Sequence, residues 1–412
     1  MAQGRTDVAA EAELGLFKLA WRTGRAAERA ERRERLLAMI ADQPPSLSKG
    51  LVQAAMASEL VIANLPEALA VAGEATADAR LLGHRRLEAL ALGALGMAKV
   101  RQQGDPGGLD DLARSIEILS ELQLPDQLII HRINYAAELE RLGDLAAGFA
   151  SQAAARDIAA TYEGCTSPFV EQFLRGLAVK EHYWTGRWEE AERIAGELLD
   201  PAGGTAQHYM ASVVRVFRGR IRLARNFPDE AERDAAAGLD LARSVGDPQL
   251  LEAALAFRAR VLAYLGHHAA AGALLDELLG GLGGRLLDQN LASDLPLTMV
   301  ALGQPAERLT SIGLLPSRWL DAAVALLDGD KGAAGQYAAM GARPDEAAAR
   351  LLAARRLLDA GRRMEAITEA SAARSFAAEA GACAFVNQAQ DLLNEARAES
   401  STAASPRPSQ ST

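Results

Sequence analysis

Four arginines on one predicted helix are the residues best placed to bind a charged partner. In the stretch SVVRVFRGRIRLARN they recur at intervals of three, four and three residues, and they are Arg215, Arg218, Arg222 and Arg225. That spacing puts them on one face of a helix, about 100° around from an apolar stripe. Guanidinium groups donate paired hydrogen bonds to carboxylates and phosphates. No acid lies between Ser212 and Pro228, so the stripe either pairs with acids on neighbouring helices or binds an acidic partner in a groove.

Patterns typical of catalysis and of metal binding are missing from the sequence. The stretch DGDKGAAG around Lys331 lacks the GxxxxGK[ST] spacing of a phosphate loop. We find no HExxH, no nucleophile elbow and no strand-borne aspartate pair. Five scattered histidines show no metal-ligand spacing, and they are His131, His182, His208, His267 and His268. We predict no catalytic residue, no metal and no cofactor, and a protein that is not an enzyme.

Composition favours a helical protein over the other classes. Of the 412 residues 49% are hydrophobic, mainly Ala and Leu, and only 5% are aromatic, so strand-forming residues are sparse. A net charge of −10 argues against direct nucleic-acid binding. No apolar run reaches the roughly 18 residues of a membrane span, and acids enter where a signal-peptide core would begin. Cys165 and Cys383 form no CxxC pair. We expect a cytoplasmic protein that does not bind membranes.

The elements that must position the arginines repeat about every 40 residues. One series of turn-like sequences is centred on Gly104, Gly143, Gly186, Asn226 and Gly266. A second series falls between them, at Gly83, Pro125, Gly164, Pro201 and Gly246. The intervals suit helices of roughly 15–18 residues. The sequence therefore predicts a stack of antiparallel helical hairpins.

The aromatic stretch EHYWTGRWEEAERIAGELLD fits one of these turns. Trp184 and Trp188 flank Gly186, which we expect to end the first helix in a left-handed conformation. Five positions after the turn residue lies a small alanine that lets paired helices approach closely, at Ala191, Ala231, Ala271 and Ala366. We interpret the aromatic cluster as structural rather than as a pocket.

The regular period breaks once, in a glycine-rich stretch that runs from Gly280 to Gly284. We predict a solenoid over residues 1–279, an irregular region of shortened helices over 280–343, and further helical repeats over 344–399. Residues 400–412, SSTAASPRPSQST, are expected to be disordered, because they hold no apolar residue beyond Ala.

Several stretches resemble tetratricopeptide-type repeats in the C-terminal tails of large bacterial signalling proteins. They include YWTGRWEEAERIAGELL, GRIRLARNFPDEAERDAAAGLDLARSVGDPQ and RRLLDAGRRMEAITEASAARSFAAEAGACAFVNQAQDLL, and the resemblance covers roughly 11–398. In those proteins the tail follows an ATPase module, which follows a class III adenylate/guanylate cyclase domain. Similar tails occur in large ATP-binding LuxR-type regulators. The resemblance implies a regulatory role, with upstream cyclase or ATPase domains as partners.

These observations together predict an all-α protein, a right-handed, tetratricopeptide-like superhelix of antiparallel hairpins. We expect a non-catalytic protein-interaction or sensory scaffold that binds a protein or acidic peptide in its concave groove. Two alternatives stay open. One is an enzyme with an unrecognised site in that groove. The other is a small-ligand-binding module, for which a buried titratable residue in the groove would be the sign.

Overall fold

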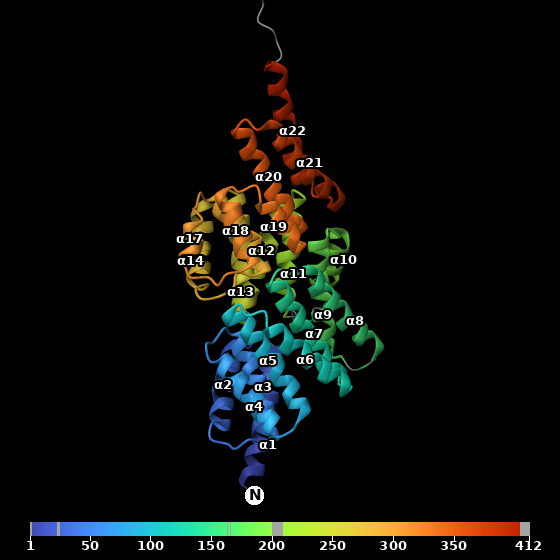
Figure 1. The fold of residues 1–412 in the computed structure, drawn as a ribbon, viewed down its shortest axis with the longest axis vertical. Coiled ribbons are helices and arrows are strands. Elements are labelled where there is room, and N and C mark those ends of the chain that lie inside the picture. Colours follow the sequence, from blue (N-terminus) through green and yellow to red (C-terminus); the bar gives the residue numbers. More distant parts are fainter. Residues whose placement is uncertain (1, 23–24, 163, 165, 200–208, 404–412) are drawn as a thin grey trace, which may run out of the picture.

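The computed structural model describes residues 2–22, 25–162, 164, 166–199 and 209–403. Over these residues the chain is a series of helical hairpins that runs along the long axis of the molecule from the N-terminus to the C-terminus (Figure 1). The described residues form no β-strand, and one isolated parallel bridge joins Leu286 to Leu315. The predicted all-α superhelix of antiparallel hairpins is confirmed.

The first part of the chain consists of helices that pair in chain order. They are α1 (Ala2–Arg22), α2 (Ala26–Ile40), α3 (Leu47–Ile62), α4 (Ala68–Leu81), α5 (Arg85–Gln103), α6 (Gly108–Glu121), α7 (Pro125–Arg141), α8 (Leu145–Thr161), α9 (Pro168–Thr185), α10 (Trp188–Leu199), α11 (Ala211–Ala224), α12 (Pro228–Val245), α13 (Pro248–Tyr264) and α14 (His268–Gly280).

The predicted turn residues that are Gly or Asn adopt the left-handed backbone that ends a helix, whereas Pro125 is the first residue of α7. Gly186 has φ 81° and caps α9, and its amide hydrogen bonds to the last turn of that helix. Asn226 takes the same conformation, with φ 66°, between α11 and α12. The predicted turn at Pro201 lies outside the described residues. These turns hold neighbouring helices antiparallel.

The aromatic cluster around Gly186 is part of the core, as interpreted from sequence. Trp184 and Trp188 are both buried. Trp188 stacks on Tyr183 at 5.9 Å between ring centroids, and its indole Nε1 donates to the Tyr183 carbonyl at 2.9 Å. The small alanines predicted to allow close helix packing are also buried, at Ala191, Ala231, Ala271 and Ala366.

The helices that directly follow α14 are shorter than those before it. The short helices that follow are α15 (Gln289–Ala292), α16 (Asp294–Ala301), α17 (Glu307–Thr310), α18 (Arg318–Asp328) and α19 (Ala333–Met340). Longer helices then return as α20 (Arg343–Asp359), α21 (Arg363–Ala380) and α22 (Cys383–Ala403). Helix α22 continues past residue 400, where the disordered tail was expected to begin, because neither Gly nor Pro interrupts it before Pro406. Residues 404–412 lie outside the described residues.

The later part of the chain packs against the turns of the earlier hairpins. The Arg318 side chain of α18 donates to the Gly143 carbonyl, in the α7–α8 turn, at 2.7 Å. Arg343 of α20 donates to the Thr185 carbonyl at the end of α9 at 3.0 Å. The Arg225 side chain at the end of α11 lies 3.5 Å from the Ala380 carbonyl of α21. Hairpins far apart in sequence therefore share one interface, which we call the seam.

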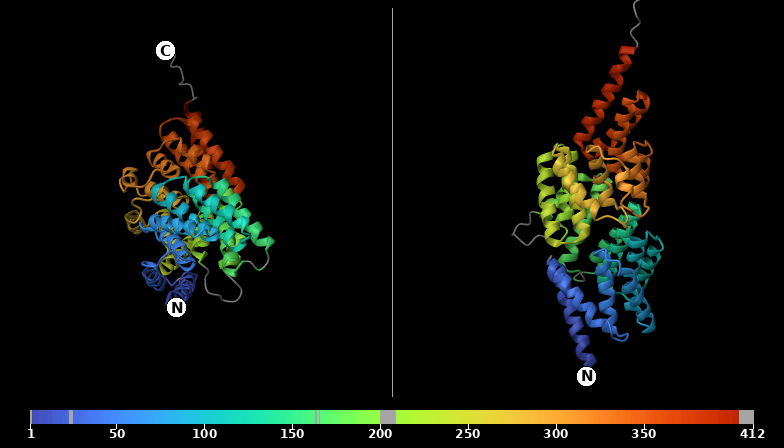
Figure 2. Two further views of the ribbon diagram at one scale, coloured as in Figure 1. Left: turned by 60° about the horizontal axis from the view of Figure 1, so that its bottom comes forward. Right: turned by 90° about the vertical axis from the view of Figure 1, so that its left-hand side faces the viewer.

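The N-terminal hairpin also reaches the middle of the chain. Arg29 of α2 pairs with Glu59 of α3 at 3.2 Å and lies 3.5 Å from the Gly246 carbonyl between α12 and α13. The approach of α1 and α2 to this region can be followed in Figure 2. The superhelix thus closes on itself.

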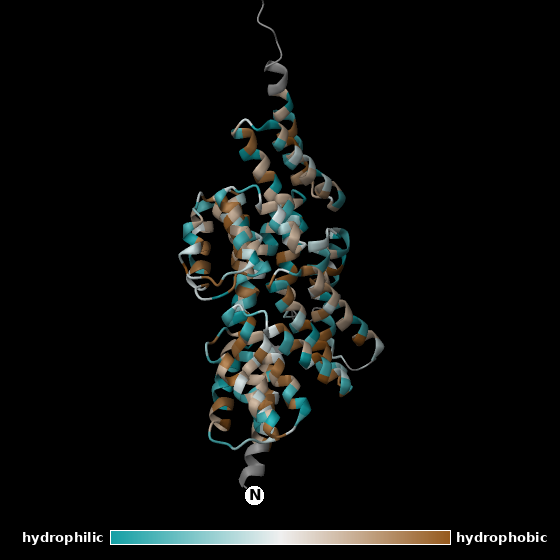
Figure 3. Ribbon diagram, viewed as in Figure 1, coloured by the Kyte–Doolittle hydropathy of each residue, from teal (hydrophilic) through white to brown (hydrophobic). Residues whose placement is uncertain are grey.

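Hydrophobic and hydrophilic residues alternate around the helices, as Figure 3 shows. Apolar faces pack against neighbouring helices, although several helices also bury charged residues, such as Arg101, Glu138 and Arg220. No helix in the described part of the chain is both long enough and apolar enough to cross a membrane.

Candidate functional site

The arginine stripe predicted from sequence lies on α11, between acids of two neighbouring helices. Asp234 of α12 accepts two hydrogen bonds from Arg218, at 2.9 and 2.7 Å, and one from Arg222 at 3.0 Å. Arg215 adds a longer contact to the same carboxylate at 3.4 Å.

The fourth arginine, Arg225, pairs with Glu192 of α10. All four side chains are therefore engaged within the protein, which is the first of the two outcomes that the sequence allowed. This pairing favours a structural role for the stripe. Binding of an acidic partner there stays a prediction.

A second group of cations, which the sequence-based prediction did not include, lies on five alternate helices. They recur about 40 residues apart on α5, α7, α9, α11 and α13, and they are Arg101, Arg141, Lys180, Arg220 and Arg260. The first four are buried, and the Arg260 side chain is 16% exposed. We call these residues the cation series. A cationic side chain therefore occupies the equivalent position in each successive hairpin.

Buried carboxylates neutralise the cation series. Glu138 accepts from Arg101 at 2.7 Å and from Arg141 at 3.1 Å. Glu140, on the same helix, pairs with Lys180. Without these partners each buried cation would be strongly destabilising.

The remaining counter-ions come from residues 288–294, a stretch we call the inner segment. Asp288 accepts from Arg141 at 2.7 Å. Asp294 accepts from Arg220 at 2.9 Å and from Arg260 at 2.8 Å. The Asn290 carbonyl accepts a further bond from Arg220 at 2.6 Å.

The inner segment is also anchored by apolar side chains, since Leu287, Leu291 and Leu295 are all buried. The surface that carries the cation series is thus covered by the chain itself. An open groove was expected along these helices. At the cation series it is occupied by the inner segment, which the sequence predicted only as part of an irregular region.

A buried carboxyl group lies beside the inner segment. Asp345 of α20 accepts a hydrogen bond from the Ser293 hydroxyl at 3.1 Å. Burial raises the pKa of Asp345 to about 7, although Arg220 and Arg260 act in the opposite direction. A buried titratable residue in the groove is the sign expected of a small-ligand-binding module. Neither of the two pockets described below includes Asp345.

The larger of these pockets is a cleft of about 710 Å³ where four distant segments meet. Its walls are the α3–α4 turn (63–69), the end of α5 (101–103), the start of α13 (248–252) and the glycine-rich loop (281–285). We call it the seam cleft. On one wall Arg285 pairs with Glu252, with one contact at 2.8 Å.

Two hydrogen-bond donors in the seam cleft have no partner in the described part of the protein. The Asn64 amide nitrogen Nδ2 is buried and unpartnered. Arg101 uses Nε for Glu138 and Nη1 for Gln249, at 2.7 and 3.1 Å, which leaves its Nη2 without a hydrogen bond among the described residues. A site with free donors can accept an anionic or carbonyl-bearing ligand.

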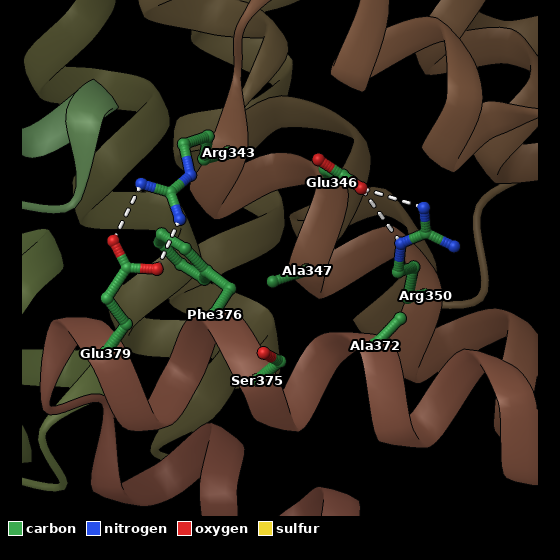
Figure 4. A pocket seen from close by; sticks show the side chains of 8 residues that line it. All are labelled: Arg343, Glu346, Ala347, Arg350, Ala372, Ser375, Phe376 and Glu379. Atoms are coloured by element: carbon green, nitrogen blue, oxygen red, sulfur yellow. Dashed lines mark hydrogen bonds and ion pairs between the residues drawn. The ribbon is translucent and has the colours of Figure 1, made fainter.

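The smaller pocket, of about 210 Å³, lies between α20 and α21. Figure 4 shows its charged side chains paired at both ends. Arg343 holds Glu379 through bonds of 3.1 and 2.7 Å, and Arg350 holds Glu346 at 3.0 and 2.8 Å. Because these charges are satisfied within the protein, this pocket is the weaker candidate.

The histidines have structural surroundings where the structure describes them. His131 is buried, and its Nδ1 lies 2.7 Å from the Ser115 hydroxyl. Burial lowers the pKa of His131 to about 4, so the ring is neutral near pH 7. No cluster of three or more potential metal ligands occurs among the described residues. His208 lies outside them.

The cation series could have been found from sequence, because the 40-residue period that locates the turns also locates its members. The seam cleft could not have been found in this way. Its walls come from four segments, and no local pattern indicates that Asn64 and Gly284 meet.

Comparison with known proteins gives a fold and no family. No family model and no curated protein sequence matches the chain. A crystal structure of a Rap protein complexed with Competence and Sporulation Factor is 12% identical, covers 94% of this chain and 99% of its own, and has a TM-score of 0.55.

Two other solved structures are more distant. The apo form of the quorum sensor NprR from B. thuringiensis is 13% identical, covers 90% of this chain and 99% of its own, and has a TM-score of 0.47. A circular tandem repeat protein is 13% identical, covers 96% of each chain, and has a TM-score of only 0.18. The first similarity alone is close enough to compare folds. The chain has a helical-repeat fold similar to that of the Rap protein.

Proposed function

We propose that this protein is a non-catalytic regulatory scaffold that binds a peptide or protein segment. The observation that carries the proposal is the similarity in fold to a Rap protein solved in complex with Competence and Sporulation Factor, over 94% of one chain and 99% of the other. A superhelix of hairpins offers an extended surface of the kind such proteins use for recognition.

The parent system is proposed from the sequence resemblance. The quoted stretches resemble the tails of bacterial cyclase–ATPase proteins and of LuxR-type regulators, and this resemblance supports a role in cytoplasmic signalling. Its partners would then include upstream cyclase or ATPase domains as well as an acidic peptide. The adjacent coding sequence tests this parentage, since a cyclase or ATPase reading frame directly upstream would support it and an unrelated frame would not.

Peptide binding can be tested without knowing the natural partner. Phage-displayed random heptapeptides would be selected on the purified chain and counter-selected on an unrelated helical-repeat protein. We expect an enriched family whose synthetic, fluorescein-labelled members bind with a saturable change in anisotropy. The same preparation should neither hydrolyse ATP nor form cyclic nucleotides. Absence of any enriched peptide, or turnover that follows the protein through purification, would count against the scaffold.

A small-ligand-binding module is the second candidate. It is favoured by the volume of the seam cleft, about 710 Å³, which falls within the roughly 300–1,000 Å³ of typical ligand sites. Native mass spectrometry of the purified protein would distinguish the two, because a retained metabolite adds a defined mass that disappears after denaturation.

A further inference from the structure

The seam cleft has the size and the unpartnered groups of a binding site. We propose that it holds the partner peptide and selects a segment that carries a carboxylate side chain. This inference rests on the scaffold function proposed above and locates its peptide-binding site in the seam cleft.

The donors of the cleft specify the chemistry of its occupant. Buried polar groups in proteins are nearly always hydrogen-bonded, and Asn64 Nδ2 has no acceptor among the described residues, so a ligand could supply one. Arg101, with only 8% of its side chain exposed, lines the same cleft and has Nη2 unused. A carboxylate can accept from an amide and a guanidinium at once.

The charges around the cleft favour an anion over a cation. Two guanidinium groups, of Arg101 and Arg285, line it with one carboxylate, that of Glu252, and Arg101 also pairs with Glu138, which is not part of the lining. Glu252 is already engaged by Arg285, through contacts to both of its oxygens. A cationic ligand would lie near Arg101 and would find no unpaired carboxylate in the lining. An anionic ligand would accept hydrogen bonds from the donors that remain unpartnered.

The glycine-rich loop suits a peptide rather than a compact ion. Gly281, Gly283 and Gly284 bring backbone, without side chains, to one wall of the cleft. A Cβ added at Gly284 would meet nothing within 4 Å, so that part of the wall is open. A volume of about 710 Å³ is far larger than one carboxylate requires and leaves room for the neighbouring residues of a peptide.

The position of the cleft gives a bound peptide contact with both the early hairpins and the middle of the chain. The α3–α4 turn and α5 belong to the early hairpins, and α13 and the loop after α14 belong to the middle of the chain. A ligand that contacts all four segments therefore binds the closed arrangement and not the separate parts. It should stabilise the whole chain by mass action.

Two substitutions test the cleft without disturbing the buried ion pairs. Asn64→Asp keeps the side-chain shape and removes the amide donor while adding a charge that repels a carboxylate. Asn64 has φ 55°, and Asp tolerates this left-handed backbone. Gln103→Trp fills the cleft from an exposed position whose side chain makes no hydrogen bond among the described residues.

A matched control is available at another turn. Asn226 also has a left-handed backbone, with φ 66°, is exposed, and lies outside the cleft. Asn226→Asp therefore introduces the same chemical change in the same backbone geometry. All three variants would first be checked for unchanged circular dichroism and melting temperature.

The probe is the best heptapeptide from the selection described above, labelled with fluorescein and compared with its own Asp→Asn or Glu→Gln version. We expect Asn64→Asp to weaken binding about tenfold or more, Gln103→Trp to abolish it, and Asn226→Asp to leave it unchanged. Neutralising the acid of the peptide should weaken binding to the wild-type protein and have little further effect on Asn64→Asp.

The other outcomes separate the two proposals. A peptide that binds the wild type and Gln103→Trp equally well places its site elsewhere, so the cleft is wrong while the scaffold function stands. If a peptide fails to bind Gln103→Trp but binds the wild type equally well with and without its acid, the site is the cleft and the proposed carboxylate preference is wrong. If no peptide is selected at all, the proposed function and the cleft both fail.

Discussion

At the scale of single residues, the interior of this superhelix depends on carboxylates that each hold more than one arginine. Asp234, Glu138 and Asp294 all do so. The positions of their arginines could be read from helical spacing or from the repeat. The partners could not, because Asp294 comes from an irregular segment distant in sequence.

The pairing of the arginine stripe makes Asp234 a residue on which stability depends. Asp234→Asn leaves Arg215, Arg218 and Arg222 close together without their shared negative charge. We expect a loss of roughly 3 kcal/mol in the free energy of unfolding, measured by urea denaturation. Glu190→Gln, at an exposed pair with Arg193, should leave the free energy of unfolding nearly unchanged. If Asp234→Asn leaves the free energy of unfolding unchanged and alters the binding of an acidic peptide, the arginine stripe has a binding role and not a structural one.

Asp345 should make stability depend on pH near neutrality. Its folded pKa, about 7, lies above the ordinary 3.8, so the folded state binds the proton more tightly than the unfolded state. Its protonated form contributes stability that is fully present below about pH 4 and is lost as the pH rises through 7. Glu59, whose pKa burial also raises to about 7, acts in the same direction.

Asp345→Asn removes this titration and keeps an oxygen that can accept from Ser293. We expect the variant to unfold at a higher urea concentration than the wild type at pH 8, with a smaller difference at pH 5 and nearly the same concentration at pH 4. Urea denaturation at several pH values measures this. A wild-type protein whose stability rises from pH 5 to pH 8 as much as that of the variant would contradict the assignment.

At the scale of helices and turns, the sequence predicted most of what the structure shows. Helix periodicity and the left-handed turn residues both follow from local chemistry. The prediction was less complete where short helices pack by contacts distant in sequence. No local sequence pattern indicates that residues 288–294 lie against α7, α11 and α13. The sequence therefore predicted an open groove, whereas these residues fill the groove at that place.

Two glycines on either side of Trp188 should respond in opposite ways to alanine. Gly186 has φ 81°, and a Cβ there would come within 3.1 Å of Phe376, so Gly186→Ala should cost about 1–2 kcal/mol or more. Gly196 lies inside α10, where a Cβ meets nothing within 4 Å. Gly196→Ala should stabilise by about 0.5–1 kcal/mol. Thermal melts of both variants measure the difference, and equal effects would mean that Gly186 is not a required cap.

At the scale of the whole molecule, the seam makes this repeat protein unlike a linear array. In a simple solenoid each repeat contacts only its neighbours, and stability is a sum of local terms. Here α18 and α20 contact turns that precede them by well over a hundred residues, as in the bond from Arg318 to Gly143. The fold could be predicted from the repeat, but this closure could not, since it depends on the pitch of the superhelix.

The seam implies cooperative unfolding. Tryptophans on both sides of it, Trp184 and Trp319, lie with their ring centroids 6.0 Å apart. We expect urea transitions followed by tryptophan fluorescence and by far-ultraviolet circular dichroism to coincide. Two separated transitions would show that the hairpins unfold piecemeal and that the seam contributes little.

The inner segment has a consequence for the order in which the protein is synthesised. Arg220 emerges 74 residues before Asp294, the carboxylate that neutralises it. At about 5–20 residues per second the ribosome needs roughly 4–15 s to supply that partner. During this interval the nascent hairpins carry interior cations without their counter-ions, and they cannot close around them. The hairpins that carry Arg220 and Arg260 must therefore wait for the inner segment to be translated before they can finish folding.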